Sequence, residues 1–238
     1  MHIYPPAPAA PPQEGKPPTE AALIELDQVT VTFGRQPVLR AINVGVPRGQ
    51  TLVVLGESGC GKTVLLKLIV GLLEPTAGKV RFDGRTLADL DGEELIRQRL
   101  LEVGLPTAAL TKKPAELSGG MKKRVGLARA LALDPEVMLY DEPTTGLDPI
   151  MSDVINELIL RARQQQPITS VVVTHDMKTA QKVADRAVML YPLARLPAGE
   201  PQVLYDGPPA GLRDHPDPRV RQFVEGEARD RLLQMQEE

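Results

Sequence analysis

The spacing of hydrophobic and polar residues changes several times along this chain, and each spacing predicts a type of element. Residues 24–33 alternate between apolar and polar side chains, and residues 38–46 alternate again. This period of two is typical of strands with one buried face. Residues 34–37, Gly-Arg-Gln-Pro, form a turn between them. We therefore predict an antiparallel pair of strands near the start of the chain.

Beyond this pair, short apolar runs alternate with stretches of helical spacing. The runs are rich in Val and Leu and too short for helices, which favours buried strands. Strands are predicted at 51–55, 79–82, 137–140, 170–174, 186–191 and 203–205, and helices at 64–71, 91–101, 118–133, 150–165, 178–184 and within 218–238. Strands that alternate with helices predict an α/β fold with a parallel sheet.

Composition sets limits on the class of protein. The 238 residues are 42% hydrophobic and 25% charged, which suits one large or two small globular domains. The net charge is −3, so no basic surface argues for nucleic acid. Seven prolines within residues 1–20 predict a disordered or polyproline-II tail, with a proline-motif docking site as the alternative.

Neither a disulfide nor a membrane span is expected. Cys60 is the one cysteine; a small spacer residue is its first interpretation and a redox role the alternative. The longest apolar stretch, 64–73, is interrupted by Lys67 and falls short of the roughly 20 residues a span requires. The first residues lack the apolar region of a secretory signal. We expect any membrane role to come through partner subunits.

The clearest chemical motif follows the predicted strand 51–55. Two glycines separated by four residues and followed by Lys and Thr form a phosphate-binding loop between a strand and a helix. Glycines let backbone N–H groups face a polyphosphate, Lys reaches the outer phosphates and the Thr hydroxyl ligates Mg²⁺. A Gly-rich turn that binds nothing is the alternative. The predicted cofactor-binding residues here are Gly56, Glu57, Ser58, Gly59, Cys60, Gly61, Lys62 and Thr63.

Polar residues also follow two other predicted strands. Asp141 and Glu142 end one strand, and His175 follows another. A carboxylate at such a place can hold the Mg²⁺ of a nucleotide, and a second one can act as general base on water. Ligands bind at the carboxyl edge of open α/β sheets, so we expect these motifs to meet the phosphate loop there. An ordinary acidic turn is the alternative.

A second anion site is predicted where another helix begins. Ser118 is a good N-cap, and Gly119, Gly120 and Met121 follow it. A hydroxyl, exposed N–H groups and a helix dipole suit a phosphate, although a plain N-cap is the alternative. Two such helix starts in one chain suggest that they enclose one nucleotide between chains or lobes.

The ordered motifs GESGCGKT, LSGGM, VMLYDEP, TTGLD and VVVTHD resemble the nucleotide-binding subunit of ABC transporters. This resemblance implies a P-loop NTPase of ABC type with ATP and Mg²⁺ as cofactors. It implies a nucleotide-binding ATPase core (21–91 and 134–210), with a mostly parallel sheet and an N-terminal antiparallel β subdomain. It also implies a shortened helical signature subdomain (92–133) and a C-terminal tail (211–238). It further implies a homodimer that works with transmembrane permease subunits, peripheral on the cytoplasmic face of the inner membrane.

The same resemblance implies roles for single residues. Asp141 with Thr63 is the metal site, Glu142 the catalytic base and His175 the switch histidine. Ser118 to Met121 form the signature that completes the ATP site of a second copy, and Asp148 belongs to the loop that contacts the partner. Phe33, 23 residues before Gly56, matches the aromatic residue that stacks on adenine. A core residue is the alternative for Phe33.

A narrower resemblance is to the Mla group, which energises phospholipid transport between Gram-negative membranes. It rests on Met121 in place of the usual Gln, on the run from Met121 to Arg129, on DPI at 148–150 and on the tail HPDPRVRQF at 215–223. In that group the tail reaches the other nucleotide-binding subunit, and a solvated helix is the alternative. Residues 192–202 form a longer, Pro-rich loop than this edge usually has.

One departure from the family is large. Only 118 − 62 = 56 positions separate Lys62 from Ser118, where the family carries several tens more. The Q-loop strand and its glutamine are expected to be missing, and Gln98 is not assigned to that role. The leading function is ATP hydrolysis that drives phospholipid transport. The alternatives are a degenerate subunit that binds ATP without coupling, and a soluble ABC ATPase of DNA repair or translation, which the acidic charge disfavours.

Overall fold

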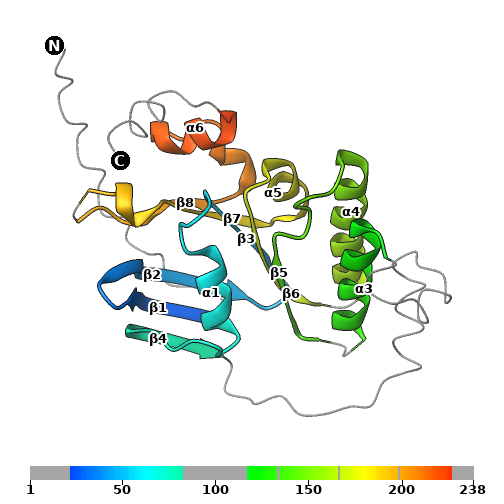
Figure 1. Cartoon of the computed structure of the whole chain (residues 1–238), viewed down its shortest axis with the longest axis horizontal. Helices are drawn as coiled ribbons and strands as arrows, with labels where there is room; N and C mark the ends of the chain where they lie inside the picture. Colours follow the sequence, from blue (N-terminus) through cyan, green and yellow to red (C-terminus); the bar gives the residue numbers. More distant parts are fainter. Residues whose placement is uncertain (1–21, 83–116, 133–134, 166, 198, 227–238) are drawn as a thin grey trace.

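The computed structural model describes residues 22–82, 117–132, 135–165, 167–197 and 199–226 (Figure 1). The predicted tail 1–20, the helix 91–101, the loop 104–114 and the end of the C-terminal tail lie outside these ranges, as does Gln98. The division into domains stays a prediction.

A three-stranded antiparallel sheet begins the described chain. Its strands are β1 (Ala22–Phe33), β2 (Gln36–Pro47) and β4 (Ala77–Phe82), in the order β2-β1-β4. The predicted pairing of the first two strands is confirmed, with Phe33 opposite Gln36 at the turn. The apolar residues alternate with polar ones along β1 and β2, so one face of this sheet packs in the core.

A five-stranded sheet forms the centre, in the order β5-β6-β3-β7-β8. Its strands are β3 (Thr51–Leu55), β5 (Val137–Asp141), β6 (Thr169–Thr174), β7 (Arg186–Leu190) and β8 (Val203–Gly207). All neighbours are parallel except β7 and β8, which are antiparallel. The predicted mostly parallel core is therefore confirmed, and its apolar runs are buried on both faces.

Helices and the antiparallel sheet cover the two faces of this centre. The helices are α1 (Lys62–Ile69), α3 (Gly119–Leu131), α4 (Pro149–Gln165), α5 (Met177–Val183) and α6 (Pro218–Glu225), with 3₁₀ turns η3 (Leu193–Arg195) and η4 (Pro209–Leu212). Alternate residues of β3 point to opposite sides. Val53 packs with residues of α3, α4 and α5, whereas Val54 packs with residues of α1 and the antiparallel sheet.

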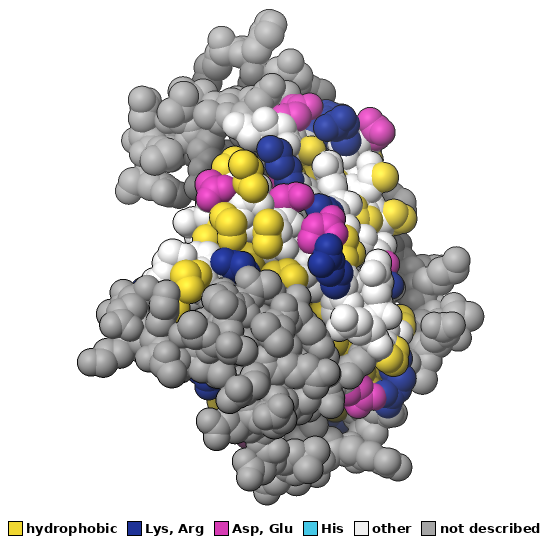
Figure 2. Space-filling model, turned by 90° about the vertical axis from the view of Figure 1, so that its right-hand side faces the viewer, with side chains coloured by type: hydrophobic (Ala, Val, Ile, Leu, Met, Phe, Trp, Pro, Cys, Tyr) yellow, Lys and Arg dark blue, Asp and Glu magenta, His cyan; other side chains and the backbone are white. Residues whose placement is uncertain are grey.

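The outer surface is mixed in charge. Figure 2 shows acidic and basic side chains among apolar ones on the side that carries α3 and α4. Lys182 pairs with both Asp153 (2.6 Å) and Glu157 (2.7 Å), an example of this intermixing. Within the described ranges, no helix combines the length and the apolar content that crossing a bilayer requires.

Candidate functional site

The carboxyl ends of three adjacent strands bring the predicted motifs together. The phosphate loop follows β3, Asp141 is the last residue of β5, and His175 follows β6. Because the sheet order is β5-β6-β3, these three ends are neighbours. The predicted convergence at this edge is confirmed, as the crevice rule for open α/β sheets leads one to expect.

Glycines are required by the shape of the phosphate loop. Gly56 has a φ of 153°, and a Cβ there would lie 2.5 Å from both the Cys60 Sγ and the Leu190 carbonyl oxygen. Gly61 caps α1 in a left-handed conformation, where a Cβ would lie 2.6 Å from the Cδ2 of Leu39. No side chain caps this helix start, so its first N–H groups are available to an anion.

Lys62 lies over the loop that precedes it. Its side chain is 8% exposed, and its Nζ donates to the carbonyl oxygens of Gly56 (2.8 Å) and Glu57 (3.1 Å). A buried ammonium needs such acceptors. Phosphate oxygens can take the place of these carbonyls, because they offer the same kind of contact with added charge.

Thr63 and Asp141 form a pair of oxygen donors beside the loop. The Thr63 hydroxyl lies 3.4 Å from Oδ1 and 3.3 Å from Oδ2 of Asp141, and both residues are exposed. A hydroxyl and a carboxylate are hard ligands of the kind that Mg²⁺ prefers. The donor set therefore fits the metal of a nucleotide.

Glu142 is the most connected group at this edge. Its Oε2 accepts from His175 Nδ1 (2.9 Å), Thr145 Oγ1 (3.0 Å) and Thr174 Oγ1 (3.3 Å). Its Oε1 lies 3.6 Å from Lys62 Nζ. Two predicted catalytic residues, Glu142 and His175, are thus in direct contact.

The environment of Glu142 favours its ionised form. Burial alone would raise the pKa of this carboxyl, but hydrogen bonds from His175 and Thr145 and the nearby charges of His175 and Lys62 outweigh it, so the pKa lies below its ordinary value. The backbone of Glu142 is left-handed, with a φ of 47°, an unusual conformation for a residue other than glycine. Such strain is concentrated at functional sites.

Sequence reasoning missed three residues around Glu142. Thr145 and Thr174 donate to its carboxylate, and Lys123 of α3 donates from Nζ to its backbone carbonyl at 2.6 Å. Burial lowers the pKa of Lys123, although the charges of Glu142 and Asp141 oppose this. Thr174 directly precedes His175 and Thr145 lies three positions after Glu142, so proximity in sequence was a usable signal for the threonines. Nothing local marked Lys123, because its partner is 19 residues away.

The signature residues occupy the start of α3. The Ser118 hydroxyl accepts from the N–H of Met121 at 3.3 Å, which confirms the predicted N-cap. Ser118 and Gly119 are exposed, whereas Gly120 is buried. A Cβ on Gly120 would lie 3.0 Å from the Cε of Met151 in α4, so this glycine allows close helix packing. An exposed helix start is what an external ligand would need.

Asp148 and Phe33 have different outcomes. Asp148 Oδ1 accepts from the N–H groups of Ile150 (3.0 Å) and Met151 (2.9 Å), so within the chain it caps α4. Its predicted contact with a partner is not tested by a single chain. Phe33 is 50% exposed at the end of β1, so the core interpretation is wrong. The exposed ring leaves adenine stacking as the standing prediction.

Burial bears on the alternatives for Cys60 and for the C-terminal helix. Cys60 is buried, and burial raises the pKa of its thiol, which favours the inert spacer over a redox role. In α6, Val220 is fully buried, and Phe223 and Val224 pack against the main core. The described part of the tail is therefore not a helix solvated on all sides. Phe223 and Val224 also line a cavity of about 480 Å³ with His175.

A family model described as ABC transporter matches residues 39–104 and 94–145. The chain is 34% identical to the intermembrane phospholipid transport system ATP-binding protein MlaF of Haemophilus influenzae, over 87% of this chain and 91% of that protein. Identity to MlaF of Escherichia coli K12 is 32%, over 87% and 90%. The probable ribonucleotide transport ATP-binding protein mkl of Mycobacterium tuberculosis is 32% identical, over 85% of this chain and 66% of that protein.

The alignment with MlaF also concerns the short span after Lys62. The alignment has 250 positions, but it includes only 87% of the 238 residues of this chain. The difference, 250 − 0.87 × 238, or about 43 positions of the alignment, has no counterpart in this chain. The two family matches overlap at 94–104, so the match breaks between Lys62 and Ser118. This break falls where the sequence predicts the missing segment. The loss of the glutamine itself stays a prediction.

Solved structures agree with the observed fold. The dimeric structure of MJ0796, a bacterial ABC transporter cassette, has a TM-score of 0.66 and 26% identity, over 78% of this chain and 98% of that one. The ADP conformation of MJ1267, an ATP-binding cassette of an ABC transporter, has a TM-score of 0.72 at 19% identity, which shows the fold alone, over 87% and 100%. The chain belongs to the ATP-binding subunits of ABC transporters, because the family model and these relatives match it and it has the phosphate loop and the acidic strand end.

Proposed function

We propose that this chain hydrolyses ATP with Mg²⁺, as one half of a dimer, and so drives phospholipid transport through a membrane partner. One observation carries the proposal. Lys62, Thr63, Asp141, Glu142 and His175 lie in contact at one sheet edge, next to a loop that has no room for a side chain at Gly56 or Gly61. These are the parts that phosphoryl transfer to water requires.

Glu142 is the proposed general base. Its lowered pKa keeps it ionised at neutral pH, so it can accept a proton from an attacking water. His175 and the two threonines orient the carboxylate by hydrogen bonds to Oε2. Oε1 faces Lys62, which orders the side chain further. Polyphosphate draws Lys62 toward itself and frees Oε1 for water.

Thr63 and Asp141 are the proposed holders of Mg²⁺, which would supply charge neutralisation on the phosphates. Their oxygens already lie within 3.4 Å of one another, and both are exposed to an incoming nucleotide. Phe33, exposed at the end of β1, is the proposed stacking partner of adenine. Ser118 to Met121 serve the nucleotide of a second copy, because their helix start opens outward.

The test of hydrolysis is a single substitution at the base. Purified Glu142→Gln should lose ATP turnover by roughly a hundredfold or more, because the amide cannot accept the proton. Glu157→Gln, at a half-exposed glutamate of α4 that pairs with Lys182, is the matched control and should keep the wild-type rate. Equal rates in wild type and Glu142→Gln would sink the hydrolysis proposal.

Phospholipid as cargo is supported by the names of the MlaF relatives. The membrane role is proposed to lie on the cytoplasmic face of the inner membrane, where the chain would bind transmembrane permease subunits. Reconstitution with a cognate permease in vesicles tests this directly. ATP-dependent transfer of a fluorescent phospholipid is expected, and transfer without ATP dependence would contradict it.

A second candidate is a subunit that binds ATP and assembles but does not couple hydrolysis to transport. The positions missing after Lys62 favour it, because the Q-loop region is expected to receive the permease. In the reconstituted vesicles it predicts ATP binding without lipid transfer. Robust ATP-stimulated transfer would exclude it.

A further inference from the structure

The connection from β7 to β8 reaches the phosphate loop. We call residues 192–202 the Pro-rich loop; it contains η3 and ends in Gln202, which is only 1% exposed. The sequence predicts a longer loop than this edge usually has, and the proposed catalytic steps do not use it. Its side chains nevertheless contact two spacer residues of the nucleotide site.

Arg195 and Gln202 make these contacts. Arg195 Nη2 lies 2.8 Å from Glu57 Oε2, and Gln202 Nε2 donates to the Cys60 carbonyl at 3.1 Å. Gln202 also donates to the Val38 carbonyl at 3.1 Å and accepts from the N–H of Arg40 at 3.0 Å. One segment far away in sequence thus holds the phosphate loop near its start, at Glu57, and in its middle, at Cys60.

Arg195 is itself held in place. Its side chain is 16% exposed, and its guanidinium lies 5.1 Å from the centre of the Tyr191 ring. Arg219 lies 5.2 Å from the same ring, and its Nη1 lies 2.7 Å from Glu200 in the Pro-rich loop. Arg219 belongs to α6, which Figure 1 shows near β8. Stacked and paired guanidinium groups lose little further freedom when they bind a carboxylate.

Glu57 places a negative charge inside a loop that receives polyphosphate. Its carbonyl accepts from Lys62 while its carboxylate binds Arg195, so the two cations fix both ends of this residue. Without Arg195, the carboxylate would repel the nucleotide more strongly, since charges of like sign disfavour binding. A mobile spacer would also have to be ordered on binding.

We propose that Arg195 is a positioning residue for the phosphate loop: it offsets the charge of Glu57 and fixes the loop in the shape that receives polyphosphate. The inference rests on the proposed function, namely nucleotide binding at this loop. It adds a residue outside the family motifs to the binding machinery.

The test is a mutant cycle read by the Kd of a fluorescent ATP analogue and by thermal unfolding of the full chain. Arg195→Gln should raise Kd about tenfold. Arg195→Lys should raise Kd less, because lysine keeps the positive charge but lacks the forked N–H donors of the guanidinium. Combining Arg195→Gln with Glu57→Gln should bring Kd to within about threefold of Glu57→Gln alone, since the two side chains act through one contact. The melting temperatures of the four variants should stay within about 3 °C of wild type.

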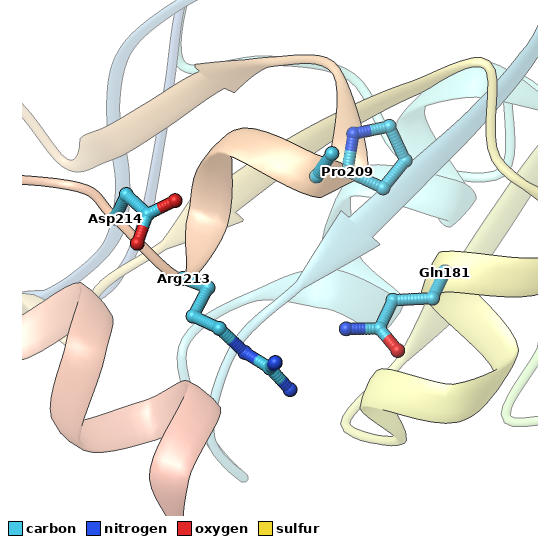
Figure 3. A pocket seen from close by; sticks show the side chains of 5 residues that line it. Gln181, Pro209, Arg213 and Asp214 are labelled. Atoms are coloured by element: carbon cyan, nitrogen blue, oxygen red, sulfur yellow. The ribbon is translucent and has the colours of Figure 1, made fainter.

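Arg213→Gln is the matched control. Arg213 lies beside a cavity of about 350 Å³ with Gln181 and Pro209 (Figure 3), and the described residues that line this cavity lie outside the phosphate loop. Arg213→Gln changes the net charge by the same amount as Arg195→Gln. Its Kd for the ATP analogue should stay within about twofold of wild type. Two results would overturn this inference without touching the proposed function. One is an unchanged Kd in Arg195→Gln. The other is a rise in Kd from Arg195→Gln that is as large in the Glu57→Gln background as in the wild type. Absence of binding by wild type would overturn the proposed function and this inference together.

Discussion

The phosphate-loop edge and the signature helix α3 are built in opposite ways. At the edge, groups that follow three strands meet within one chain. For example, the Glu142 carboxylate contacts both Lys62 and His175. At α3, Ser118 caps its own helix and is exposed. One region holds most of the groups proposed for catalysis, and the other is the anion site proposed to serve the nucleotide of a second copy. The difference supports the proposed composite site, which a dimer with twofold symmetry would complete.

The largest effect should come from separating these two regions onto different chains. Lys62→Ala and Ser118→Arg homodimers should each lose ATP turnover by about a hundredfold, because each site lacks one half. A purified heterodimer of the two variants has one intact composite site and should recover about half of the wild-type rate. A heterodimer as inactive as its parents would contradict the shared site.

The shape of the phosphate loop is the next target. Gly56→Ala would place a Cβ 2.5 Å from the Leu190 carbonyl oxygen, which belongs to a central strand. ATP affinity should fall at least about tenfold, since backbone in a buried sheet cannot move aside. Isothermal titration with ATP measures this. Wild-type affinity in Gly56→Ala would mean that the loop adopts another shape when it binds.

A substitution at Phe33 tests whether the site also binds the adenine of ATP. Phe33→Ala should weaken ATP binding about fivefold to tenfold, because stacking on an aromatic ring contributes on the order of 1–3 kcal/mol per base. Stability should change little, since the ring is half exposed. The control is inorganic triphosphate, whose affinity the substitution should leave unchanged. An equal loss for both ligands would contradict stacking.

The smallest effect is expected in α3 itself. Gly126 is exposed within the helix, and among the described residues no atom beyond its chain neighbours and its own helix backbone lies within 4 Å of where its Cβ would be. Gly126→Ala should stabilise the chain by about 0.5–1 kcal/mol, a rise in melting temperature of roughly 1–4 °C, with unchanged ATP turnover. Calorimetry checks the first point. A lower melting temperature would show that α3 needs flexibility at this position.

Local patterns predicted most elements. Alternation in β1 and β2 and apolar runs in β3, β5 and β6 mark half-buried and fully buried strands, so their places follow from periodicity alone. The ends of α1 differ from the prediction by two residues, because Gly61 rather than Thr63 begins the turn. Boundaries depend on cap geometry, which residue type does not decide.

The sequence by itself determined the identity of the chemical groups, because the phosphate loop and the acidic strand end are local motifs. Only the tertiary structure decided how Glu142 is surrounded and how Arg195 meets Glu57, 138 positions earlier. It also showed that Phe33 is exposed, which a strand pattern cannot tell. The physical reason is that such contacts depend on strand order and loop path, and neighbouring residues along the chain do not encode these.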